Sequence, residues 1–174
     1  MFRSMLAATV SAGLLFGSLA ASAEEPAADS PARNSVSLQV AGCGDQCAEF
    51  EITIYDNGRV LFRPNNSKNS TKAPFSKTGM QNIYSRVARY LQDTGALTEP
   101  AECADRKADA PVVIVQATKD SQVQKATWSS GCSNQLEKAR SLVKVFVNQT
   151  RMWRNINSDS RYWEKYWETW EEKK

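Results

Sequence analysis

The sequence predicts an α+β domain of about five antiparallel strands with two core helices and an amphipathic C-terminal helix. Three observations predict this class: alternating apolar residues that mark strands, turn residues that join strands into hairpins, and apolar residues spaced at three and four that mark helices. Hairpins place neighbouring strands antiparallel, and two helices can cover one face of a sheet. The predicted order is therefore strand, hairpin, helix, hairpin, helix.

The first strand is predicted at 35–40, SVSLQV, and the second at 49–55, EFEITIY, because apolar residues fall at every other position. Between the second strand and 59–63, its predicted partner, the Asn57-Gly58 pair indicates a tight hairpin. Asn-Gly tolerates the positive φ angles of a primed turn, so we expect a turn of that type.

Residues 65–77, NNSKNSTKAPFSK, have the composition of turns and linkers. A helix is predicted over 78–97, with Gly95 as its C-terminal stop. Its apolar residues recur at three and four and are expected to face the core: Met80, Ile83, Tyr84, Val87 and Leu91.

A second hairpin is predicted from 112–118 and 123–128, joined around Asp120. The continuous apolar run Val112–Val115 favours a central strand that is covered on both faces. A second helix is predicted over 133–147, which Ser133 could cap. Its core-facing residues are expected to be Leu136, Ala139, Val143 and Phe146.

The first 23 residues have the pattern of a signal peptide. An early cation precedes an apolar run, and the segment closes on the small residues that precede a cleavage site, with Ala23 last. We expect cleavage after Ala23 and a periplasmic or secreted bacterial protein; the alternative is an uncleaved N-terminal anchor. Beyond it we expect a flexible leader at 24–34, one domain at 35–153, and a linker with the C-terminal helix at 154–174.

Four cysteines lie in the expected mature chain, and an even number in an oxidising compartment favours disulfides. Of three possible pairings, we predict Cys43–Cys47 and Cys103–Cys132, because the CGDQC stretch can form the tight turn that a bond across three residues needs. The alternatives are a redox pair of Cys43 and Cys47, or a metal site. Redox cysteines favour closer spacing, and zinc sites favour histidines, which this chain lacks.

The stretch from Cys43 to Gly58, with its cysteine pair, alternating strand and hairpin glycine, resembles the bacterial domain of unknown function 6438 family. Asp109 and Pro111, just before a buried strand, are similar to a second part of that family's pattern, and the resemblance spans residues 35–153. The chain has Ala48 where the family often has proline, and Phe50 where it often has tyrosine. The family has no established activity, so the resemblance implies a fold and a compartment and carries over no catalytic residue.

The sequence favours a binding module over an enzyme. The absence of histidine excludes Ser-His-Asp and Cys-His catalysis. Asp105 and Asp109 flank two cations in what is more simply a solvated loop, although a small carboxylate-dependent hydrolase is an alternative. We expect no cofactor and no metal. The net charge of +3 and the absence of a basic stripe argue against nucleic acid.

The end of the chain, RYWEKYWETWEEKK, predicts an amphipathic helix. Its aromatic face comprises Trp163, Tyr166, Trp167 and Trp170. This face could fold back onto the domain, or it could bind a partner in the envelope. The charges of the segment balance, which disfavours attraction to anionic lipid, so we expect an envelope protein as the partner.

Overall fold

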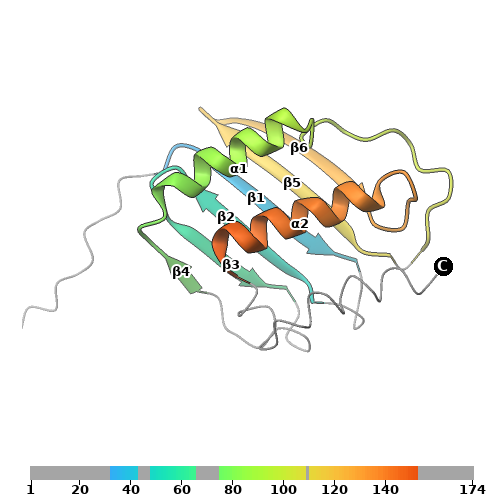
Figure 1. The fold of residues 1–174 in the computed structure, drawn as a ribbon, viewed down its shortest axis with the longest axis horizontal. Helices are drawn as coiled ribbons and strands as arrows, with labels where there is room; N and C mark the ends of the chain where they lie inside the picture. Colours follow the sequence, from blue (N-terminus) through green and yellow to red (C-terminus); the bar gives the residue numbers. More distant parts are fainter. Residues whose placement is uncertain (1–31, 43–47, 66–74, 109, 153–174) are drawn as a thin grey trace, which may run out of the picture.

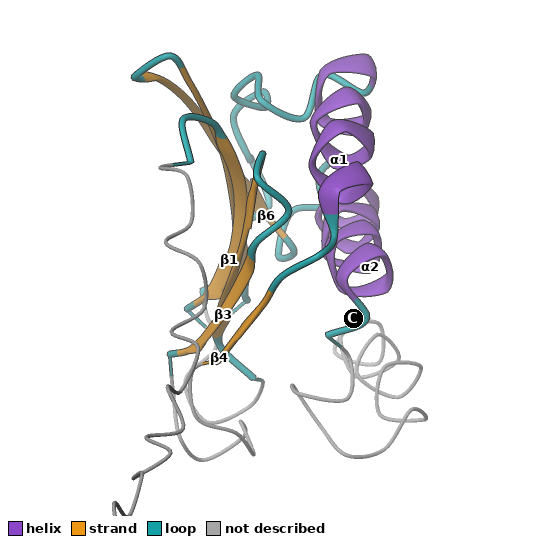
Figure 2. Ribbon diagram, turned by 90° about the vertical axis from the view of Figure 1, so that its left-hand side faces the viewer, coloured by secondary structure: helices purple, strands orange, loops and turns teal. Residues whose placement is uncertain are grey.

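A computed structural model of the chain describes residues 32–42, 48–65, 75–108 and 110–152. These residues form a two-layer α+β fold, in which a six-stranded antiparallel sheet carries two helices on one face (Figures 1 and 2). The strands are β1 (Ser35–Ala41), β2 (Phe50–Tyr55), β3 (Val60–Pro64), β4 (Phe75–Lys77), β5 (Val112–Lys119) and β6 (Gln122–Ser129). The helices are α1 (Gln81–Asp93) and α2 (Leu136–Thr150).

The strand order in the sheet is β4-β3-β2-β1-β5-β6, and every neighbouring pair is antiparallel. The first strand of the chain therefore lies in the middle, between the two predicted hairpins. Leu38 faces Ile52 on one side and Val115 on the other, and all three side chains are fully buried. Leu91 of α1 and Phe146 of α2 belong to the same buried cluster, so the core lies between the sheet and the helices.

The predicted class is confirmed, but the expected count of five strands is wrong. The sixth strand is β4, which lies within the stretch 65–77 that was predicted to be a linker. It pairs with β3 over only three positions, for example Val60 with Lys77. A three-residue edge strand after a long polar stretch is too short to show alternation, so its pairing comes from tertiary contact.

The prediction of a primed turn between β2 and β3 is wrong, and a turn of that type joins β5 to β6 instead. At the β2–β3 turn only Gly58 has a positive φ, and its N–H donates to the carbonyl of Tyr55 over 3.1 Å. This is a three-residue loop with a glycine bulge. The β5–β6 turn has positive φ at both Asp120 and Ser121, 48° and 68°, as a type I′ turn requires. Asn34 accepts a hydrogen bond from the Asp120 backbone N–H over 3.1 Å.

Gly95 ends α1 as predicted. The N–H of Ala96 donates to the carbonyl of Leu91 over 2.9 Å and the N–H of Gly95 to that of Gln92 over 3.1 Å, which is the hydrogen-bond pattern of a Schellman motif. The predicted cap of α2 is wrong, because Gln135 and not Ser133 holds the N-cap position, without a side-chain capping bond.

The expectation that β5 is covered on both faces is also wrong. Val113 and Val115 are fully buried under the helices, whereas Val112 and Ile114 on the opposite face are half-buried. Both helices lie on one side of the sheet in Figure 2. Apolar residues on both faces of a strand do not therefore imply a second covering layer.

Candidate functional site

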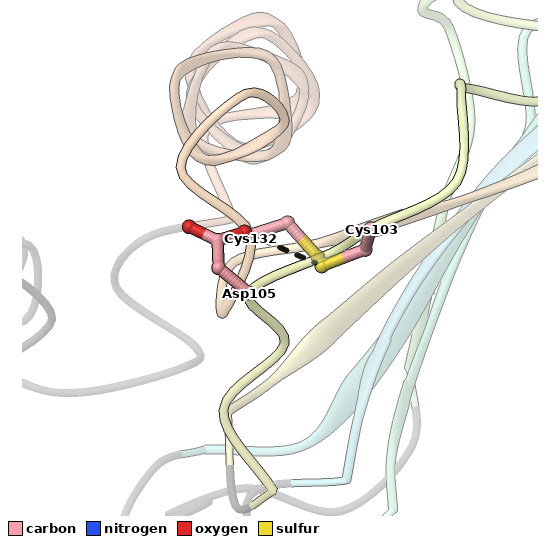
Figure 3. Close-up of side chains that lie close together, drawn as sticks. All are labelled: Cys103, Asp105 and Cys132. Atoms are coloured by element: carbon pink, nitrogen blue, oxygen red, sulfur yellow. Dashed lines mark hydrogen bonds between the residues drawn. A yellow bond between two sulfur atoms is a disulfide. The ribbon is translucent and has the colours of Figure 1, made fainter.

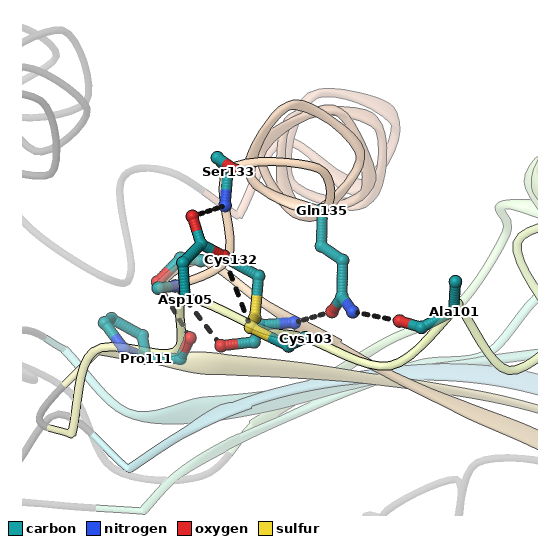
Figure 4. Close-up of a disulfide and its surroundings, with 10 residues drawn as sticks. Ala101, Cys103, Asp105, Pro111, Cys132, Ser133 and Gln135 are labelled. Atoms are coloured by element: carbon teal, nitrogen blue, oxygen red, sulfur yellow. Dashed lines mark hydrogen bonds between the residues drawn. A yellow bond between two sulfur atoms is a disulfide. The ribbon is translucent and has the colours of Figure 1, made fainter.

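The described part of the chain contains a disulfide between Cys103 and Cys132, whose Cα atoms are 5.7 Å apart (Figure 4). Cys103 lies in the connection between α1 and β5, and Cys132 lies in the turn between β6 and α2. Cys132 is fully buried and Cys103 is half-buried. This pairing was predicted and is confirmed; Cys43 and Cys47 lie outside the described residues, so their bond stays a prediction.

Gly131 lets the two segments approach each other. The N–H of Lys107 donates to the carbonyl of Gly131 over 3.2 Å. A Cβ atom placed on Gly131 would lie 2.6 Å from the Cβ of Ala110, closer than real Cβ contacts come. Both the N–H and the hydroxyl of Ser130 donate to the carbonyl of Pro111, over 3.0 and 2.8 Å. The disulfide therefore reinforces an existing contact between the turn and the connection.

Gln135 bridges the end of β6 and the same connection (Figure 4). Its side chain is buried; its carbonyl oxygen accepts from the Ser129 N–H over 2.9 Å, and its amide nitrogen donates to the Ala101 carbonyl over 2.9 Å. Glu99 accepts from the Thr127 N–H over 3.2 Å. Two N–H groups of an edge strand are thereby satisfied by side chains, which protects this part of the edge from pairing with another chain.

Asp105 sets the electrostatics around the disulfide (Figure 3). One carboxylate oxygen lies 3.7 Å from the sulfur of Cys103, and the other accepts from the Ser133 N–H over 3.3 Å. Hydrogen bonds from the Ser133 side chain and backbone, aided by the charge of Lys107, lower the pKa of Asp105 below its usual 3.8. The exposed carboxylate is thus ionised at neutral pH, and Cys103 has a negative charge beside it.

Cys103, Asp105 and Cys132 also form the one cluster of three potential metal ligands among the described residues, with ligand atoms all within 4.8 Å. Metals bind thiolates, and sulfurs joined in a disulfide offer none. Redox-active cysteines need cationic surroundings that stabilise the thiolate, whereas Asp105 does the opposite. The arrangement therefore acts as a cross-link, and it could hold a cation only after reduction.

The Asp105→Asn variant is expected to be reduced by dithiothreitol faster than the wild type at low salt, because it removes a negative charge beside the sulfur of Cys103. The attacking group is a thiolate, so the Asp105 carboxylate repels it. Asparagine retains an oxygen that can accept from the Ser133 N–H. The measurement is the rate at which the thiols of Cys103 and Cys132 become open to alkylation.

Asp120→Asn serves as the matched control, because Asp120 is exposed and lies at the far end of β6 from the disulfide. Its rate should equal that of the wild type, and the effect of Asp105→Asn should fade in high salt. An unchanged or slower rate in Asp105→Asn would show that the carboxylate does not shield the bond.

The structure does not place the other site residues that were predicted from the sequence. The aromatic face of Trp163, Tyr166, Trp167 and Trp170 lies outside the described residues, as do Asp109 and the predicted signal peptide. Gln135 and Glu99 carried no sequence signal, because their role depends on which backbone groups face them in the fold.

A scan against models of known protein families finds none that matches this chain, and a search of curated proteins also finds no match. The resemblance of Cys43–Gly58 to the family of unknown function 6438 therefore stays a prediction. Neither α1 nor α2, the helices of the described residues, is long and apolar enough to cross a membrane.

Proposed function

We propose that this chain is an exported, disulfide-stabilised α+β domain of the bacterial envelope that works as a binding or interaction module. The observation that carries the proposal is that Cys103 and Cys132 are joined in a disulfide. The one cluster of cysteine and carboxylate ligands among the described residues is closed by the Cys103–Cys132 bond, with Cys132 fully buried. A cross-link of this kind supports a scaffold role in an oxidising compartment.

The binding element in this proposal is the aromatic face that the sequence predicts around Trp167. Each tryptophan offers about 150–250 Å² of surface for burial, and a short helix is marginal in water unless something covers that surface. Asp105 beside Cys103 disfavours redox chemistry at the Cys103–Cys132 bond. The thiol-redox alternative rests on Cys43 and Cys47, and it is tested separately. The hydrolase alternative requires two carboxylates about 5–10 Å apart in a cleft.

The proposal is tested by immobilising the mature chain, from Glu24, and capturing proteins from an envelope extract. We expect Trp167→Ala to abolish capture of a specific protein while the thermal midpoint stays within about 2 °C, because an interface residue contributes little to the stability of the free domain. Glu168→Ala, on the opposite face of the predicted helix, should capture as the wild type does.

A lower thermal midpoint in Trp167→Ala, with capture unchanged, would contradict the binding role of this face and place the segment on its own domain. Turnover in an insulin-reduction assay that is lost on changing Cys43 and Cys47 to serine would replace the proposal with the thiol-redox alternative.

A further inference from the structure

The two helices bring basic residues from distant parts of the chain close together in the helical layer. The hydroxyls of Tyr90 and Ser141 are 2.6 Å apart, and the Lys138 ammonium donates to the Thr94 carbonyl over 2.8 Å. Residue numbers therefore rise along α1 as they fall along α2, so the helices are antiparallel (Figure 1). The first turns of α1 accordingly lie beside the last turns of α2.

Four exposed cations lie along the two helices, three of them near the middle of the layer and one at the end where α2 closes. We call them the basic helix patch: Arg86 and Arg89 of α1, Lys144 of α2, and Arg151, which follows α2. Residues 80–92 and 138–152 contain no aspartate or glutamate. Among ion pairs between described residues, none involves a member of the patch.

The acidic residues of the two helices lie at the other end of the layer. Asp93 ends α1 and Glu137 is in the first turn of α2, and the antiparallel arrangement brings these ends together. Arg86 also donates to the Asn82 carbonyl over 3.2 Å, but that bond leaves its charge uncompensated. At the end of the layer that holds Asp93 and Glu137, Lys138 and Arg140 offset these two charges, so the uncompensated positive charge of the two helices lies on the basic helix patch.

We propose that the basic helix patch binds the surface of a phospholipid bilayer that carries anionic headgroups. Lysine and arginine near such a surface each raise the affinity by about fivefold. Two helices side by side, each about 20 Å long, present a broad layer rather than a single ridge. This deepens the proposed function and depends on its export, because an exported chain meets anionic lipid and not nucleic acid.

A protein partner fits the basic helix patch less well. Protein interfaces have an apolar centre from which charged residues are depleted. The one exposed large apolar side chain among the described residues is Val123, which lies on β6 and not on the helices. The patch is thus charged without an apolar centre, which suits a polyanionic surface.

The test is co-sedimentation of the mature chain with vesicles of phosphatidylglycerol mixed into phosphatidylcholine, against vesicles of phosphatidylcholine alone. We expect binding to the anionic vesicles that weakens as salt is added. The double variant Arg89→Gln with Lys144→Gln should bind about 25-fold more weakly, since it removes two charges from the patch.

The matched control is Lys119→Gln with Lys125→Gln, which removes the same charge from exposed positions in the β5–β6 hairpin. It should bind the anionic vesicles as the wild type does. Equal losses in both double variants, no preference for phosphatidylglycerol, or tighter binding to a DNA duplex at the same salt would overturn the proposal. The vesicle test contains only purified protein and lipid, whereas the capture test measures binding to proteins of the envelope. Failure of the vesicle test therefore leaves the capture test of the proposed function unaffected.

Discussion

Replacing both Cys103 and Cys132 with alanine is expected to lower the free energy of unfolding by about 3.6 kcal/mol. The two residues are 29 positions apart, and closing a loop of that size removes conformational freedom from the unfolded chain. In the folded state, the same bond holds the connection before β5 to the turn before α2. Guanidinium denaturation without reductant would measure the loss.

Cys43→Ala with Cys47→Ala provides the comparison. If these residues are bonded as predicted, the loop they close is much shorter, and the loss should be about 2 kcal/mol. A smaller loss for the Cys103 and Cys132 variant than for this one would contradict the assignment of Cys103–Cys132 as the main cross-link.

Gly131→Ala is expected to destabilise the domain by about 2 kcal/mol, although it adds only a methyl group. The new Cβ would lie 2.6 Å from the Cβ of Ala110 and 3.1 Å from both the backbone nitrogen and oxygen of Lys107. Either the turn or the connection must move, and both are held by the Cys103–Cys132 bond. Chemical denaturation gives the change in the free energy of unfolding.

Ala110→Gly added to Gly131→Ala is the informative control, because it removes the nearest atom that the new methyl group would meet. The double variant should be more stable than Gly131→Ala alone, even though glycine at 110 increases the freedom of the unfolded chain. No recovery, or no loss in the single variant, would show that this close approach does not constrain the fold.

Much of the fold follows from local sequence patterns. The alternation in 35–40 and 49–55 predicts β1 and β2, and the three-and-four spacing around Ile83 predicts α1, with Gly95 as its stop. What the patterns miss depends on tertiary contact. β4 forms because β3 offers it an edge, and Asp120 and Ser121 adopt positive φ although neither is glycine.

The site around the Cys103–Cys132 bond was likewise predictable only in part from the sequence. An even set of cysteines in an expected oxidising compartment predicts disulfides, and the tight turn expected in CGDQC leaves Cys103 and Cys132 as the second pair. The carboxylate of Asp105 beside the bond and the bridge made by Gln135 could not be predicted, since each depends on which loop lies opposite. No basic stripe is visible along the sequence, because Arg89 and Lys144 are brought together only by helix pairing.

The account is tested most directly on protein recovered from the periplasmic fraction of a bacterium that produces the full chain, with free thiols alkylated at lysis. N-terminal sequencing and mass mapping of non-reduced peptides would be read together. We expect the chain to begin at Glu24 and to yield a linked peptide pair that contains Cys103 and Cys132. A chain that keeps Met1, stays in the cytoplasm and carries alkylated Cys103 and Cys132 would contradict the account.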